Sequence, residues 1–90
     1  MKPGRVPPGW DRFAAELANM ARERGFTSAR GIYGITVFDK DLRDRLWIAP
    51  SGQYMSYYYD TDKNQVSTHH GHGSEGTIRT HLTEWMNLRS

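Results

Sequence analysis

The sequence contains no cysteine. Disulfide bonds, thiolate zinc sites and cysteine nucleophiles are therefore excluded from any account of its stability or chemistry. The chain also lacks an apolar run near the ~18 residues of a membrane span, and no signal-peptide pattern follows Met1. These absences predict a soluble, cytoplasmic protein that does not enter a membrane.

An excess of charge of one sign is also missing. Twelve Lys and Arg residues oppose ten Asp and Glu residues, which leaves a net charge of only +2. A dedicated nucleic-acid binder usually carries a denser stripe of Lys and Arg. The charge therefore favours a protein partner, with RNA as the alternative.

Ninety residues predict one small domain. Residues 1–8 contain three prolines and a glycine, which predicts a flexible N-terminal arm before a domain that spans residues 9–90. An apolar stripe at helical spacing predicts a helix from Gly9 to Arg24, with Gly25 as the left-handed residue that ends it. A closing helix is predicted to begin near Ser74, a favourable N-cap.

Between the two helices the side chains alternate as they do in half-buried strands. The predicted strands cover residues 32–39, 45–49, 54–60 and 65–70, and the segment His69 to Gly73 (HHGHG) is predicted as a loop. The short connections permit only antiparallel neighbours. The expected fold is α+β: a helix, a three- or four-stranded antiparallel meander and a second helix, with both helices on one sheet face.

The alternation also assigns residues to the two faces of the sheet. The predicted core face carries Leu46, Ile48, Met55, Tyr57 and Val66. The opposite face then displays aromatic side chains, a residue type enriched where proteins bind partners. The predicted partner-binding residues are Phe38, Arg45, Trp47, Tyr54, Tyr58, His70 and His72. In the alternative, the sheet curls and these aromatic side chains pack beneath the N-terminal arm, or a crossing loop covers them.

Short motifs in the second half of the chain match a known pattern. Gly52-Gln53-Tyr54 precedes Tyr57, Val66-Ser67-Thr68-His69-His70 ends the next strand, and Glu75-Gly76-Thr77-Ile78-Arg79 opens the closing helix. This pattern resembles the HicA-type toxins, which share the double-stranded-RNA-binding-like fold. Tyr54 stands where that family has its catalytic histidine. The resemblance implies an RNA-binding protein or a metal-independent ribonuclease.

A ribonuclease needs a general base and a cation for the phosphate. The candidate groups in this chain are His69, His70, Arg79 and Tyr54. His70 and His72 are also expected to point the same way, as two metal ligands would, with His81 near enough to join them. No carboxylate is fixed beside these histidines and glycines flank them, so we predict neither a metal site nor a cofactor.

The composition and the aromatic face together favour a non-catalytic binding protein. A protein-binding inhibitor or adaptor, of the small size that mobile elements and phages encode, is the function that we expect. The HicA-like RNA binder or ribonuclease is the alternative.

Overall fold

The computed structural model describes residues 7–41, 43–60, 62 and 65–89, without the side chains of residues 59, 60 and 65–67. Residues 1–6, which form most of the predicted arm, lie outside the described residues. Along the chain, two helices flank five strands. The order is α1 (Trp10–Glu23), β1 (Thr27–Gly31), β2 (Gly34–Phe38), β3 (Arg45–Ile48), β4 (Gln53–Asp60), β5 (Gln65–His72) and α2 (Glu75–Asn87). No described helix has the length and apolar character that crossing a membrane requires.

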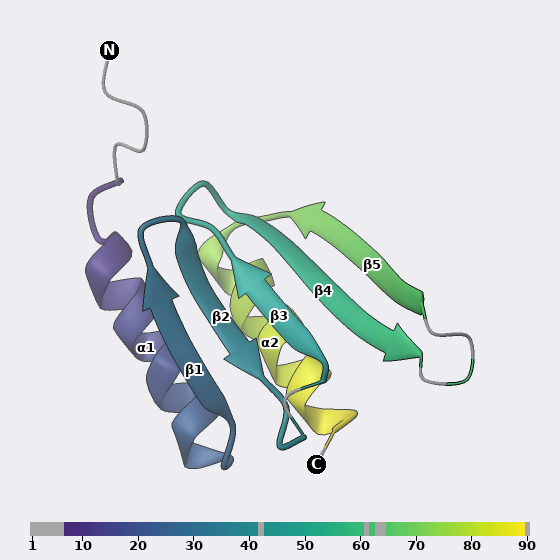
Figure 1. The fold of residues 1–90 in the computed structure, drawn as a ribbon. Coiled ribbons are helices and arrows are strands. Elements are labelled where there is room, and N and C mark those ends of the chain that lie inside the picture. The colour runs from purple at the N-terminus through teal and green to yellow at the C-terminus, as the bar shows by residue number, and fades with distance from the viewer. Residues whose placement is uncertain (1–6, 42, 61, 63–64, 90) are drawn as a thin grey trace.

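The strands form one antiparallel meander in the order β1-β2-β3-β4-β5. Figure 1 shows α1 behind β1 and α2 behind β2 and β3, so both helices cover the same face of the sheet. The β4–β5 pair extends sideways beyond the helices. The predicted α+β class and the helix–sheet–helix order are confirmed, and the sheet has one strand more than the larger predicted number.

The additional strand is β1. Its side chains are exposed except for Ser28, which is intermediate, so no apolar alternation marks it in the sequence. The strand predicted to begin at Ile32 begins at Gly34, because Ile32 and Tyr33 form the β1–β2 turn and are 80% and 73% exposed. Periodicity detects strands that pack against a core and misses an edge strand that does not.

Local sequence rules predict the helix ends well. After α1, Gly25 has φ +82°, its N–H donates to Arg22 O, and the N–H of Phe26 donates to Ala21 O. These are the two hydrogen bonds of a Schellman motif, in which a glycine supplies the left-handed residue. At the start of α2, the Ser74 hydroxyl accepts a hydrogen bond from the Thr77 N–H at 3.3 Å, as an N-cap residue does.

The core lies between the helices and the central strands. It consists of Trp10, Phe13, Ala14, Leu17, Ala21, Phe26, Ile35, Val37, Leu46, Ile48, Ile78, Leu82, Trp85 and Met86. Two arginines tie α2 to its neighbours. Arg79 bonds to Glu16 of α1, and Arg89, whose side chain is only 11% exposed, pairs with Asp44 before β3 at 3.1 Å.

The prediction of the faces of β4 is wrong. Ile48 pairs with Tyr54 and Leu46 with Ser56, so Tyr54, Ser56 and Tyr58 lie on the helix side. Met55 and Tyr57 lie on the open side. The cause is the turn: Ala49 N–H donates to Gln53 O, which leaves three loop residues, with Gly52 at φ +96°. A loop with an odd number of residues pairs even-numbered residues of β3 with even-numbered residues of β4. A change of one residue in this register exchanges the side chains between the two faces of the sheet.

The HHGHG segment is also more regular than predicted, since β5 continues through His72. Gly71 pairs with Tyr54, and a Cβ at Gly71 would lie 2.5 Å from the Tyr54 hydroxyl oxygen. The glycine therefore makes room for the tyrosine ring across the strands and does not loosen the chain. The side chain of Val66, which was predicted to face the core, is not among the side chains that the structure describes.

Candidate functional site

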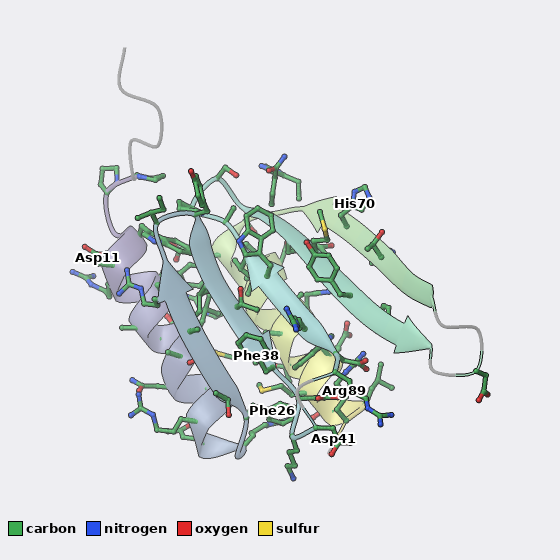
Figure 2. All side chains as sticks on the ribbon, in the orientation of Figure 1. Asp11, Phe26, Phe38, Asp41, His70 and Arg89 are labelled. Atoms are coloured by element: carbon green, nitrogen blue, oxygen red, sulfur yellow. The ribbon has the colours of Figure 1, made fainter. Side chains whose placement is uncertain are left out.

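The sheet face opposite the helices is the candidate site. The strand pairing places two rows of side chains on it, Phe38-Arg45-Tyr57-Thr68 and Thr36-Trp47-Met55-His70. Phe38, Trp47, Met55 and Tyr57 are partly exposed, and Arg45 and His70 are exposed. In Figure 2, Phe38 on β2 and His70 on β5 mark the two sides of this surface. We call Phe38, Arg45, Trp47, Met55, Tyr57 and His70 the outer face.

Arginine and aromatic groups on the outer face contact one another directly. The Arg45 guanidinium carbon lies 5.4 Å from the centre of the Phe38 ring, which is cation–π geometry. Tyr57 is the cross-strand neighbour of Arg45 on the other side. The described strand residues of this face include no Asp or Glu, so its fixed charge is positive.

Trp47 lies between two hollows. At one end of the sheet it lines a largely apolar hollow with Pro7, Ile32, Tyr33, Ala49, Pro50 and Ser51. On the β4–β5 side it lines a second hollow with Gln53, Tyr54, Met55, His70, Gly71 and His72. The open face of the sheet therefore has two recesses beside the partly exposed Trp47, each of a kind that an apolar side chain of a partner can enter.

A second cluster lies on the helix side, at the β5 edge. The rings of Tyr54 and His81 have centroids 4.2 Å apart, and the His69 and His81 rings are stacked at 6.4 Å. His81 Nε2 is buried and has no hydrogen-bond partner. Burial, and secondarily the nearby His69, lower the pKa of His81, while Glu84 acts in the opposite direction. Burial therefore favours the neutral imidazole of His81.

Five predicted partner-binding residues lie on the open side of the sheet: Phe38, Arg45, Trp47, His70 and His72. Two lie on the helix side instead. Tyr54 packs against the core and His81, and Tyr58 accepts a hydrogen bond from Ser56 Oγ beneath the Arg89 guanidinium. Met55 and Tyr57 occupy the open positions in their place. The three-residue turn, read with its register, is the sequence signal that would have found them.

The ribonuclease candidates are not brought together on one surface. His69 and His70 are successive strand residues and point to opposite faces. Arg79 bonds to Glu16, and its Nη2 also lies 3.3 Å from Glu75 Oε1. The bond between Arg79 and Glu16 lowers the pKa of the carboxyl and raises that of the guanidinium. The charge of Arg79 is thus already neutralised by carboxylates.

The histidines predicted to share a side do so, since His70 and His72 both lie on the open face. His72 Nε2 is 2.9 Å from the carbonyl oxygen of Ser51, which fastens β5 to the β3–β4 turn. His81 lies across the sheet, near His69, and cannot complete a set with them. Within the described part of the chain, no three His, Asp or Glu side chains are placed to hold a metal ion.

Comparison with protein-family models, with curated protein sequences and with solved structures found no match.

Proposed function

We propose that this protein is a non-catalytic binding module that docks a protein partner on its outer face. The observation that carries the proposal is a sheet face left open by both helices and lined by aromatic, Met and Arg side chains. Tyr, Trp and Arg dominate the binding energy of protein interfaces, and flexible Met side chains adapt to a partner's shape. A domain of this size would act as an inhibitor or adaptor of a larger protein.

Each outer-face residue has a role in this proposal. Trp47, between its two hollows, is the apolar anchor. Tyr57 and Met55 surround it with further apolar area. Arg45, held against Phe38, is preorganised to bond a partner carboxylate or carbonyl. Without cysteine the module needs no oxidising compartment for its stability, and we propose that it acts in the cytoplasm.

The scarcity of fixed cations supports a protein partner over RNA. Arg45 is the one fixed cation among the described strand residues of this face. An RNA-binding surface gains most of its affinity from several phosphate contacts. The aromatic side chains could stack on bases, so RNA binding is the competing result that the experiment below must detect.

The test begins with covalent capture. A photoreactive amino acid is placed at Thr36, on the open face, and in a control at Asn19, which is exposed on α1. A protein captured at Thr36 and not at Asn19 is identified and purified. Its affinity is then measured for the wild type, for Trp47→Ala and for the control Arg22→Ala, which alters an exposed residue of α1.

Trp47→Ala should weaken binding by about 30-fold or more, since a hot-spot residue contributes at least about 2 kcal/mol. Arg22→Ala should bind as the wild type does. Unchanged affinity of Trp47→Ala would contradict the proposal. So would tight binding to a structured RNA that weakens steeply with salt and is lost in Trp47→Ala, because that result assigns the outer face to phosphate and base contacts.

A further inference from the structure

The strand β5 forms one edge of the sheet, and within the described residues no other element pairs with its far side. It is eight residues long and pairs with β4 without a bulge. Its sequence, QVSTHHGH, contains no Lys, Arg, Asp, Glu or Pro. Natural proteins usually protect a long edge strand with such residues, with a bulge or with a covering element. The β5 strand has no such residue and no bulge, and Figure 1 shows this edge projecting past both helices.

The hydrogen-bond pattern shows which backbone groups of β5 point outward. The N–H of Gly73 donates to Gly52 O, and Ser56 Oγ reaches the carbonyl oxygen of His69. Odd-numbered residues of β5 therefore direct their backbone groups toward β4. In an antiparallel ladder the direction alternates along the strand, so residues 66, 68, 70 and 72 present N–H and C=O groups to the outside. A row of free donors and acceptors is a template for one more strand.

We propose that β5 pairs antiparallel with β5 of a second copy of this chain, forming a two-fold dimer with one continuous sheet. Outward-facing residues must pair with outward-facing residues, which restricts the register. When the two-fold axis passes by His69, residue 68 of one copy pairs with residue 70 of the other, and residue 66 pairs with residue 72. Each outward-facing residue then has a hydrogen-bonding partner in the other copy. His69 then faces its own copy in a non-hydrogen-bonded pair.

The absence of fixed charges along β5 makes a second copy of the same strand a suitable partner. A strand with fixed charges would meet the same charges in an isologous pairing, and like charges directly opposite each other are destabilising. The only ionisable side chains of β5 are those of His69, His70 and His72. The opposite edge is less suitable, since β1 has five residues and carries Arg30, which pairs with Asp11 of α1 at 2.7 Å.

His69 is the residue of β5 that meets its own copy across the axis, in the non-hydrogen-bonded pair. Within each copy, the His69 ring stacks on the ring of His81 in α2, and Tyr54 and Tyr58 of β4 flank it.

The test measures oligomeric state by sedimentation velocity at about pH 8. The decisive variant is Thr68→Pro, which removes an outward N–H and leaves the bonds to β4 intact. Thr68→Val is the matched control, because it changes the same exposed side chain and keeps the N–H. The wild type and Thr68→Val should be dimers at about pH 8, and Thr68→Pro a folded monomer.

A wild type that is monomeric at about pH 8 even at high concentration overturns the proposal, as does a dimer that Thr68→Pro leaves unchanged. Should Thr68→Pro fail to fold, amide exchange of the wild type decides. The Thr68 and His70 amides must become protected as concentration rises, and fast exchange at all concentrations contradicts the pairing.

Discussion

Replacing Gly34 with alanine tests the close approach of β2 to β3. Gly34 has φ +139°, and a Cβ there would lie 2.1 Å from the carbonyl oxygen of Ile48. The backbone conformation costs a non-glycine residue about 1–3 kcal/mol. Overpacking against backbone, which cannot rotate away, adds about 1–3 kcal/mol. Since about 1 kcal/mol shifts the Tm of a domain this small by about 4–8 °C, Gly34→Ala should lower Tm by about 10 °C or more.

Gly31, on the other side of the β1–β2 turn from Gly34, is the control. A Cβ there would meet nothing within 4 Å, and its φ is not in the left-handed region. Gly31→Ala should be neutral or raise stability by up to about 1 kcal/mol, because it restricts the unfolded chain. Both variants are measured by thermal circular dichroism and by urea unfolding with Trp fluorescence. If the two glycine variants melt within about 2 °C of each other, the argument from the close approach to Ile48 is refuted.

Two further predictions concern Arg89, which follows the C-terminal end of α2, and the partly buried His81 within it. Arg89→Met removes the salt bridge to Asp44 and the stacking of the guanidinium on Trp85 at 4.4 Å. This change should lower the free energy of unfolding, measured by urea titration, by about 3 kcal/mol. A loss below about 0.5 kcal/mol would show that the salt bridge contributes no more than a surface contact does. Because burial lowers the pKa of His81, the unfolded chain binds its proton more readily, so stability falls as pH drops below about 6.5. His81→Phe should flatten this fall in urea midpoints, and an unaltered pH dependence would contradict the assignment.

The helices could be predicted from the sequence because local rules determine them. The apolar stripe of α1 and the Gly25-Phe26 pair that follows it are readable without knowledge of any distant residue. Ser74 identifies the start of α2 in the same way. Short connections were sufficient to establish the antiparallel meander, and the apolar faces were sufficient to place both helices on one side of it.

The candidate site was harder to predict because it depends on register. β4 has apolar or aromatic side chains on both faces, so its own alternation does not reveal which face is buried. The choice is made outside the strand, by the three-residue turn and by the small Ser56, which fits completely buried opposite Leu46. β1 was missed for a related reason, since its side chains contribute almost nothing to the core.

The proposed dimer and the proposed binding face are geometrically compatible. A two-fold axis perpendicular to the sheet keeps the same face upward in both copies, so two outer faces would lie side by side in one plane. Linked sites of this kind bind a repetitive or dimeric partner more tightly than either site alone. Thr68→Pro should therefore lose this additional affinity and keep the affinity of one outer face, whereas Trp47→Ala should lose both. A variant that separates the two effects also shows that neither proposal depends on the other.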